Sequence, residues 1–214
     1  KEIFDYAKKI KITLFSSPFD ESAVDLLKSL NSPAYKVASF EIVDLPLIAY
    51  IAKTKKPILM STGMATLKEV REAIETAKSC GCKKLAIFHC ISSYPTPIEK
   101  ANVYSIMRLK KEFEIHVGLS DHTLGNTASI VATSLGASVI EKHFTLSRSD
   151  GGVDSEFSIE PNEMQQLVKD IHAAYLALGK ENNIRSNSEI SNKAFRRSIY
   201  FVKDIKKGEL ITGK

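Results

Sequence analysis

Short apolar runs alternate along the chain with longer stretches in which apolar residues recur every three or four positions. The runs are at most five residues long and rich in Ile, Leu and Val, as is typical of strands buried in a parallel sheet. Their centres lie roughly 22 to 30 residues apart, which suits one strand and one helix per repeat. The pattern predicts six parallel strands, at Ile12–Phe15, Tyr35–Ala38, Pro57–Met60, Leu85–His89, Ile115–Leu119 and Ser138–Ile140.

The stretches between these runs carry the signals that start and stop helices. Acidic or hydroxyl side chains stand where they can accept a hydrogen bond from the first free backbone amides. Glycine follows the last periodic residue of two stretches, where a helix ends most easily. The chain itself opens in a helical pattern. The further predicted helices are Glu21–Leu30 after Asp20, one after Asp44, one from the capping box Thr66–Glu69 to about Lys78, one from Asn126 or Thr127 to Leu135, and one from Pro161 to Leu178.

Repeated strand–helix units fit either a doubly wound sheet or a (β/α)₈ barrel. No glycine-rich turn of the dinucleotide-binding type follows any strand, which weakens the first alternative. In a barrel the carboxyl ends of the strands converge on one face, where active sites lie. We therefore predict a (β/α)₈ TIM barrel whose first two βα units precede Lys1. Polar residues follow nearly every strand: Ser16-Ser17, Ser39 and Glu41, Ser61-Thr62, Ser92-Ser93-Tyr94, Ser120-Asp121-His122 and Glu141-Lys142-His143.

The composition changes after Gly179, where an Asn- and Ser-rich segment begins. Such a segment is typical of a linker. We predict a partial barrel domain over residues 1–180, a linker over 181–197, and the beginning of a second domain over 198–214. Within the last segment we expect Ser198–Val202 to form a strand and Lys206–Glu209 a turn, with the domain continuing beyond Lys214.

Composition and charge argue against several classes of partner. The chain carries 30 Lys and Arg against 25 Asp and Glu, a formal net charge of +5. The basic residues are scattered rather than interleaved with aromatics, so no nucleic-acid partner is expected, whereas a small anionic substrate is compatible. No apolar run approaches the ~18 residues of a membrane span, so no membrane association is expected. Cys80, Cys82 and Cys90 make no disulfide framework and indicate reduced thiols in a cytoplasmic enzyme.

Two histidines stand at the ends of consecutive predicted strands. His122 and His143 would lie side by side in a barrel, with both imidazoles directed into its mouth. Two imidazoles so placed suit a divalent transition metal with positions left open for water and substrate. The alternative is that each is an ordinary polar residue at a strand end, because two ligands without a third are weak evidence.

Lys36 lies inside an otherwise apolar strand, where a lysine is costly unless an anionic group pairs with it. It could form a Schiff base, anchor a carboxylate or phosphate, or pair with Glu41 or another residue of the barrel wall. Small hydroxyl donors near one cation are typical of a phosphate pocket. The hydroxyl donors that could surround Lys36 are Ser17, Ser39, Ser61, Ser92 and Ser120.

Two further residues are candidates for contact with a sugar. Asp154 lies in a loop after Gly151 and Gly152, where it could bind hydroxyl groups, act as a base, or simply form a turn. Tyr94 precedes Pro95 and Pro97 in a loop at the predicted barrel mouth. Its ring could stack on a sugar face or serve only in packing.

The polar strand ends belong to longer motifs that follow one another along essentially the whole chain. They are Ser16–Phe19, Pro33–Glu41, Lys56–Met64, His89–Pro97, Gly118–Thr123 and Glu141–Phe144. Together and in this order they resemble the N-acetylneuraminate synthase family. The loop from Ser149 to Ser158 is more similar to the pseudaminic acid synthase branch than to the sialic acid branch. The segment Arg197–Glu209 resembles the linker into the family's antifreeze-like SAF domain.

The resemblance implies a (β/α)₈ barrel joined to an SAF domain, in a domain-swapped homodimer. It implies condensation of phosphoenolpyruvate with an N-acetylated amino sugar, which yields a nine-carbon 2-keto sugar acid and phosphate. The branch implies a pseudaminic acid synthase; an N-acetylneuraminate, legionaminic or spore-coat sugar-acid synthase is the alternative. A sugar-binding barrel without catalytic activity is the alternative from a different class.

The resemblance also implies roles for individual residues. His122 and His143 would bind the divalent metal, manganese or magnesium, with Glu41 nearby. Tyr94 and Asp154 would face the sugar. Ser17 and Ser92 depart from the sialic branch, which often has Thr and Asn there. The implied phosphoenolpyruvate ligands are Lys36, Ser39, Ser61 and Ser120.

The family also uses residues that this sequence does not contain. They are acidic and lysine residues of the first two barrel strands and an arginine of the second domain. We therefore expect the 214-residue chain by itself to be weakly active or inactive.

Overall fold

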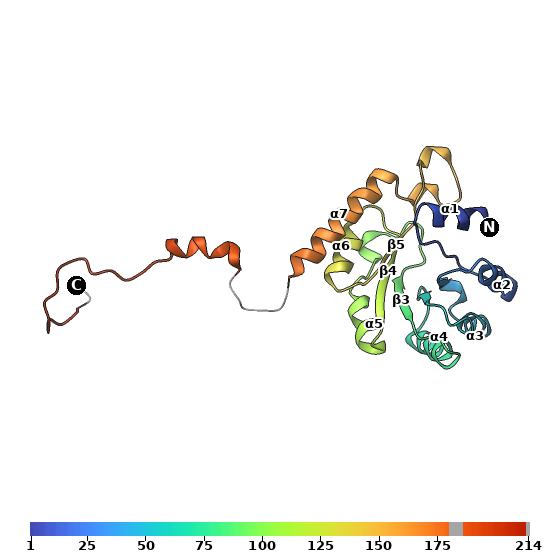
Figure 1. Ribbon diagram of the computed structural model, residues 1–214, viewed down its shortest axis with the longest axis horizontal. Helices are drawn as coiled ribbons and strands as arrows, with labels where there is room; N and C mark the ends of the chain where they lie inside the picture. The colour runs from blue at the N-terminus through green and yellow to red at the C-terminus, as the bar shows by residue number, and fades with distance from the viewer. Residues whose placement is uncertain (180–185, 213–214) are drawn as a thin grey trace. The chain divides into compact units, whose positions relative to one another are not determined.

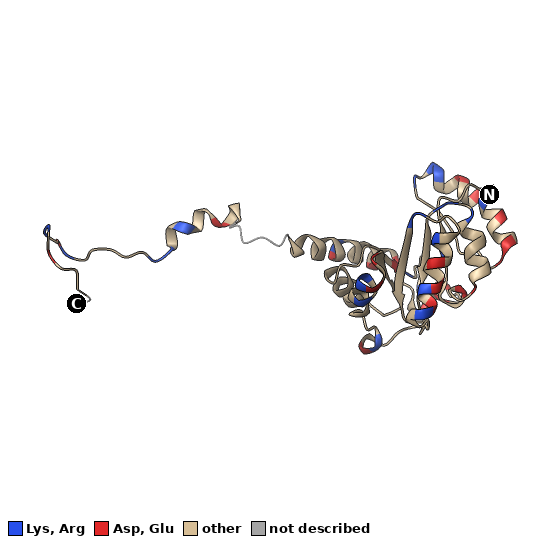
Figure 2. Cartoon of the chain, turned by 90° about the horizontal axis from the view of Figure 1, so that it is seen from below, with Lys and Arg blue, Asp and Glu red and all other residues tan. Residues whose placement is uncertain are grey.

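The computed structural model describes residues 1–179 and 186–212. The chain divides into two compact units, Lys1–Leu178 and Gly179–Lys214, which are described separately. Within the described ranges, no helix has both the length and the apolar composition needed to cross a bilayer. Basic and acidic residues are interspersed over the helices of the first unit (Figure 2), as the scattered charges of the sequence predict.

The first unit is built on a parallel sheet of five strands in the order β1-β2-β3-β4-β5. The sheet curls into half of a barrel, and the helices lie around its outer side (Figure 1). Each strand joins the next through a helical connection, which is what parallel pairing requires. The strands are β1 Tyr35–Val37, β2 Ile58–Ser61, β3 Leu85–Cys90, β4 His116–Asp121 and β5 Ile140–Lys142.

The predicted strand at Ile12–Phe15 is wrong, because this segment forms no ladder. It meets the sheet only through a single parallel bridge between Ser16 and Tyr35, with the Lys36 amide donating to the Ser16 carbonyl at 3.1 Å. No described strand pairs with its other side, and Ile12 remains 60% exposed. The segment has the apolar composition of a strand, but a single bridge on one side does not make it a strand. The described sheet therefore has five strands rather than six.

The predicted helices are confirmed, with small shifts at their ends. The Asp20 carboxylate accepts from the Ala23 amide, and Thr66 and Glu69 form both bonds of a capping box. Asn126 stands at its predicted N-cap position but makes no capping bond with its side chain. The helices are α1 Glu2–Lys9, α2 Glu21–Ser29, α3 Leu45–Ala52, α4 Leu67–Ser79, α5 Ser105–Phe113, α6 Thr127–Ser134 and α7 Pro161–Leu178.

Helix α5 is the one helix of the first unit that the sequence analysis did not identify. The N-cap residue is Tyr104, whose side chain makes no capping bond. The C-cap residue after Phe113 is Glu114, in a left-handed conformation with φ 52°. Neither end therefore carries the usual signal, although Ile106 and Leu109 show the helical spacing. Short 3₁₀ helices complete the chain: η1 Ser39–Glu41, η2 Ile98–Lys100, η3 Arg148–Asp150, η4 Ser155–Phe157, η5 Asn187–Glu189 and η6 Ser191–Phe195.

The two faces of the sheet differ in character because side chains alternate along each strand. Most of the outward residues are apolar and pack with buried residues of the helices, among them Val24, Ile48, Val70 and Ile106. The inward residues include Lys36, Ser61, Ser120 and Glu141, whereas the outward face carries the polar residues His89, Asp121 and Lys142. The hydrophobic core thus lies between sheet and helices, and leaves the concave side free for chemistry. The buried outward residues are Tyr35, Val37, Ile58, Met60, Ile87, Val117 and Leu119.

The predicted strand at Ser198–Val202 in the second unit is also wrong. The described part of this unit contains η5 and η6 but no strand, and Ile199 and Phe201 are 103% and 73% exposed. A strand is stable only when a neighbour accepts and donates its backbone hydrogen bonds. The turn at Lys206–Glu209 is confirmed by a 3.0 Å bond from the Glu209 amide to the Lys206 carbonyl. Residues 180–185 of the predicted boundary and linker lie outside the described residues.

Gly118 lies where β4 passes closest to its neighbours, and this close approach gives a test of the packing. A Cβ atom there would lie 2.6 Å from the Val139 carbonyl oxygen and 2.8 Å from the Phe88 ring. We expect Gly118→Ala to lower the free energy of unfolding by about 1–3 kcal/mol, measured by urea denaturation. Ser134→Ala, at an exposed position of α6, is the control and should change it by less than about 0.5 kcal/mol. Equal stability of the two variants would contradict the tight packing at Gly118.

Candidate active site

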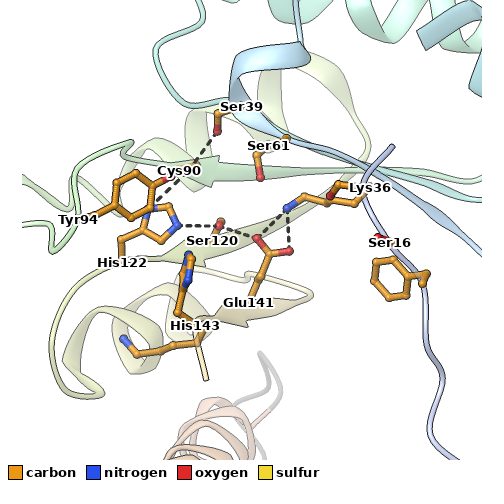
Figure 3. Close-up of a pocket in the computed structure, with 14 residues that line it drawn as sticks. Ser16, Lys36, Ser39, Ser61, Cys90, Tyr94, Ser120, His122, Glu141 and His143 are labelled. Atoms are coloured by element: carbon orange, nitrogen blue, oxygen red, sulfur yellow. Dashed lines mark hydrogen bonds and ion pairs between the residues drawn. The ribbon is translucent and has the colours of Figure 1, made fainter. Parts of the chain in front are cut away.

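A cavity of about 440 Å³ opens at the carboxyl ends of the strands, on the concave side of the sheet. Figure 3 shows the side chains that meet there, with Lys36, Ser120 and Glu141 at its centre. Each strand contributes because its last inward residue points into the same space. The lining residues are Phe15, Ser16, Ser17, Lys36, Ala38, Ser39, Ser61, Cys90, Tyr94, Ser120, His122, Glu141, Lys142 and His143.

Lys36 is held by a carboxylate across the cavity. Its Nζ donates to both Oε atoms of Glu141 at 2.7 Å, and Ser120 Oγ donates to Glu141 Oε1 at 2.7 Å. The ammonium also lies 5.1 Å from the centre of the Phe88 ring. Of the alternatives left open by the sequence, the ion pair with a wall residue is the one found here. The partner is Glu141 on β5, whereas Glu41 makes no contact with Lys36.

Glu141 is ionised in this arrangement. Burial favours the neutral form, but the Lys36 ammonium and the Ser120 hydroxyl outweigh it, so the pKa of Glu141 is lowered overall. The Lys36 side chain is 11% exposed and that of Glu141 is 38% exposed. The pair is therefore accessible to a ligand from the side of the carboxylate.

His122 follows the last residue of β4 and is fixed by its backbone surroundings. Its Nδ1 lies 2.8 Å from the Ile91 carbonyl oxygen, which can only accept, so Nδ1 carries the proton. Its Nε2 lies 3.5 Å from Ser120 Oγ, inside the cavity. Burial lowers the pKa of His122. A neutral imidazole with a free Nε2 lone pair therefore faces the cavity.

His143 follows β5 and lies next to His122, with the two ring centres 5.2 Å apart. Burial and then the neighbouring His122 lower its pKa, so it is neutral as well. Its Nδ1 is 3.5 Å from Asp154 Oδ2, which approaches from the loop after β5. The two predicted histidines are thus brought together, and Asp154 lies at the rim rather than in the lining.

Tyr94 lines the cavity beside the histidines, and the Phe157 ring packs against Tyr94 and His143. The Tyr94 ring is centred 4.3 Å from that of His122, and Phe157 lies 5.0 Å from His143 and 5.5 Å from Tyr94. Burial raises the pKa of Tyr94, so its phenol remains protonated and can donate a hydrogen bond. The cavity therefore has an ionic half around Lys36 and an aromatic half around Tyr94.

The two imidazoles fit a divalent metal in chemical terms. Both are neutral, and His122 donates its other ring N–H to a backbone carbonyl, as metal-bound histidines generally do. In the described part of the chain, no group of three or more His, Cys, Asp or Glu side chains is arranged to hold a metal. A metal bound here would therefore have two protein ligands and take the rest from water or substrate.

The predicted serines divide into two groups. Ser17, Ser39, Ser61 and Ser120 line the cavity, and Ser61 Oγ is buried without a hydrogen-bond partner among the described residues. Ser92 does not line it: its Oγ is buried behind Gly63, where a Cβ atom would overlap the hydroxyls of Ser39 and Ser92. The Ser61 hydroxyl can donate to an anion directly, whereas Ser39 and Ser120 would first have to release Cys90 and Glu141.

Glu41 ends η1 and does not line the cavity, and one of its carboxylate oxygens is buried without a partner among the described residues. Glu141 itself was missed as a site residue. The sequence does contain a signal for Glu141. Glu141 stands two residues before His143, and this spacing puts both side chains on the same face of the strand. Cys90, two residues beyond the inward Phe88, could have been found in the same way. Phe157, which ends η4 outside the sheet, has no such signal.

The Lys36–Glu141 pair makes stability depend on pH. The lowered pKa means that unfolded Glu141, at its ordinary value of 4.5, takes up a proton before the folded group does. The contribution of the pair is therefore present above about pH 4.5 and is lost as the pH falls through the folded pKa. We expect Lys36→Met to lower the free energy of unfolding by about 1–3 kcal/mol at pH 7, and by clearly less below pH 4.

Chemical denaturation at both pH values measures this difference. Lys68→Met is the control, because the exposed Lys68 ammonium lies 3.7 Å from Glu72 on α4 and should add little at either pH. If Lys36→Met lowers the free energy of unfolding equally at both pH values, packing and not the ion pair is responsible for the loss.

Comparison with known proteins agrees with the motifs. The chain matches the NeuB family over residues 1–183. It is 45% identical to a pseudaminic acid synthase of Helicobacter pylori, over 99% of this chain and 62% of that protein. It is 41% identical to an N,N'-diacetyllegionaminic acid synthase of Campylobacter jejuni, over 99% of this chain and 64% of that protein. The chain thus spans less than two thirds of the length of these relatives.

Solved structures agree as well. The N-acetylneuraminic acid (sialic acid) synthetase of Leptospira borgpetersenii, in complex with citrate, superposes with a TM-score of 0.85 at 31% identity, over 91% of this chain and 68% of that chain. A DAHP synthase of Thermotoga maritima, at 16% identity and a TM-score of 0.71, shares the fold. With the family match covering most of its length, the chain belongs to the NeuB family.

Proposed function

We propose that this chain provides the condensing site of a nonulosonic acid synthase of the pseudaminic acid type. The reaction joins phosphoenolpyruvate to an N-acetylated amino sugar and yields a nine-carbon 2-keto sugar acid and phosphate. The observation that carries the proposal is the meeting of Lys36, His122 and His143 in one hydroxyl-lined cavity. The proposal includes completion of the half-barrel to a (β/α)₈ barrel, an SAF domain and a homodimer.

Phosphoenolpyruvate binds in the ionic half of the cavity. Its carboxylate and phosphate need cationic and hydroxyl donors, which Lys36, Ser39 and Ser61 supply. Because Glu141 already takes two bonds from Lys36 in the ligand-free cavity, the incoming anion must share or replace them. Lys36 therefore acts as an anchor for the anion and not as a nucleophile.

The acceptor sugar binds against the aromatic half. Tyr94 and Phe157 offer flat apolar surfaces to a sugar ring, and the Tyr94 hydroxyl can donate to it. Asp154, at the rim beside His143, can accept from sugar hydroxyl groups. Lys36 and the histidines then lie between the two substrates, which places the enol carbon and the aldehyde face to face.

His122 and His143 would hold the divalent metal, manganese or magnesium. Bound there, such an ion supplies Lewis acidity toward an oxygen of the substrate. The chain's own residues position this chemistry: the Ile91 carbonyl fixes the His122 tautomer, and Asp154 faces the second imidazole. Both imidazoles are neutral because burial lowers the pKa of each, so no proton has to leave before they can coordinate.

The bond changes fit the remaining groups. The enol carbon of phosphoenolpyruvate bonds to the aldehyde carbon, whose oxygen takes up a proton and becomes a hydroxyl group. C2 takes up the oxygen of a water molecule with loss of a proton, and the C2–O bond to phosphate then breaks to leave the 2-keto group. Glu141 is ionised and contacts both Lys36 and Ser120, so it can accept the proton that this water releases. Lys36 and the serines stabilise the charge of the departing phosphate.

Assays of the intact protein with a panel of sugars test this function. We expect phosphate release with phosphoenolpyruvate and a 6-deoxy diacetamido hexose, together with a product of the mass of the nonulosonic acid. N-acetylmannosamine should react more slowly, since the 45% identical relative is a pseudaminic acid synthase. A reversed preference would favour the sialic acid alternative. Sugar binding without phosphate release from any member of the panel would favour the non-enzymatic barrel.

The substitution Glu141→Gln separates the binding of phosphoenolpyruvate by Lys36 from the acceptance of a proton by Glu141. The amide keeps the shape of the side chain but releases the Lys36 charge, so phosphoenolpyruvate should bind more tightly. The loss of the proton acceptor should reduce kcat by about 10²–10⁴-fold. Steady-state kinetics and calorimetric titration of phosphoenolpyruvate measure the two effects. Glu99→Gln, in the exposed η2, is the control; unchanged kcat in Glu141→Gln would exclude Glu141 as the base.

A further inference from the structure

Lys142 is among the residues that line the cavity, but its ammonium group forms a second ion pair, with Asp121, on the opposite face of β4 and β5. The parallel register pairs Ser120 with Glu141 and Asp121 with Lys142. Since side chains alternate, Ser120 and Glu141 point inward, Asp121 and Lys142 point outward, and the two histidines that follow point inward again. The outward pair therefore lies, along both strands, between the two inward pairs that form the site.

The Asp121 carboxylate is saturated with donors. Oδ1 accepts from the Thr123 amide and from Thr123 Oγ1, both at 2.8 Å. Oδ2 accepts from Ser129 Oγ on α6 at 2.6 Å and from Lys142 Nζ at 2.9 Å. The Lys142 and Asp121 side chains are only 2% and 1% exposed. No position is left for a substrate, so this cluster is not itself a binding site.

Stability alone does not account for such a cluster. Replacing a buried ion pair by apolar residues of similar volume is often neutral or stabilising, because both charges have lost their hydration. What the pair provides is a fixed geometry, since five hydrogen bonds converge on two side chains. The pair lies between the two inward pairs of the site, and this placement indicates which part of the site it holds in a fixed geometry.

The cluster closes a ring around the backbone of His122. Lys142 Nζ donates to the Thr123 carbonyl oxygen at 2.6 Å as well as to Asp121. The residues before and after His122 are thus both tied to Lys142, which directly precedes His143. A movement of one histidine relative to the other would have to break these bonds.

We propose that Asp121, Thr123 and Lys142 are positioning residues, which hold the His122 and His143 imidazoles at the separation and orientation the site requires. The inference rests on the proposed function for its meaning in catalysis. The geometric part stands on this hydrogen-bonded ring alone. These residues act through the histidines and touch no substrate.

Two mild variants of the intact protein test the proposal. Thr123→Val and Ser129→Ala each remove one hydroxyl donor to the same carboxylate, and both positions are buried. Thr123 enters the ring around His122 through its backbone carbonyl, and its hydroxyl orients the Asp121 carboxylate of that ring, whereas Ser129 ties the same carboxylate to helix α6. We expect similar losses of Tm for the two variants. We expect kcat to fall about tenfold in Thr123→Val and less than about twofold in Ser129→Ala, with little change in KM for phosphoenolpyruvate.

Two readouts do not depend on turnover. Binding of Mn²⁺ added alone, followed by electron paramagnetic resonance, should weaken about tenfold in Thr123→Val and stay within about twofold in Ser129→Ala. Nitrogen-15 spectra of the metal-free protein should show His122 as the Nδ1–H tautomer in wild type and in Ser129→Ala, and as a mixture in Thr123→Val. If the wild type does not condense the substrates, the proposed function fails, while these two readouts still decide the positioning role.

Equal effects of Thr123→Val and Ser129→Ala on kcat, Mn²⁺ affinity and tautomer would overturn the proposal and leave the cluster a purely structural role. The double variant Asp121→Asn/Lys142→Met adds a stronger contrast, because it removes both charges together and should retain more stability than Lys142→Met. Full Mn²⁺ affinity in a folded double variant would equally refute the positioning role. Should the double variant not fold, the two hydroxyl variants decide the question by themselves.

Discussion

The register between β4 and β5 is the constraint on which the site depends. Pairing of Leu119 with Ile140 sets Ser120 against Glu141 inside the cavity and brings His122 beside His143. A slip of β5 by one residue would turn that strand over relative to β4. Lys142 would then enter the cavity, and the His143 imidazole would be buried among the helices. The tight contact of Gly118 with Val139 and Phe88 and the Asp121–Lys142 pair both hold these strands in place.

Two lysine–carboxylate pairs lie on opposite faces of these strands and differ in what they can do. Lys36 and Glu141 form a pair that is open on one side, with 38% of the Glu141 side chain exposed. Lys142 and Asp121 are sealed, and every lone-pair position of the carboxylate is occupied. An open pair can exchange partners with a substrate, whereas a sealed pair can only hold its neighbours. The same two residue types thus serve binding on one face and positioning on the other.

The sequence predicted the site better than it predicted the edges of the sheet. His122, His143 and Lys36 follow from their places in buried strands, because in a parallel sheet the strand ends meet. Ile12–Phe15 and Ser198–Val202 have strand composition, but composition does not supply the hydrogen-bonding neighbour. The partner of Lys36 could not be read from the order of residues either. Glu41 is five positions away and Glu141 more than a hundred, yet the curl of the sheet brings only the latter to the ammonium.

The Lys36–Glu141 pair also explains how one cavity can both bind and release an anion. A free ammonium that is only 11% exposed would be costly when no anion is bound, because a buried charge loses its hydration. With Glu141 as its resting partner, Lys36 stays charged and the anion only has to displace a carboxylate. In the proposed reaction, the carboxylate returns when phosphate leaves, so the ammonium is never left unpaired. Binding is weaker than it would be to an unpaired lysine, but departure of the product is correspondingly easier.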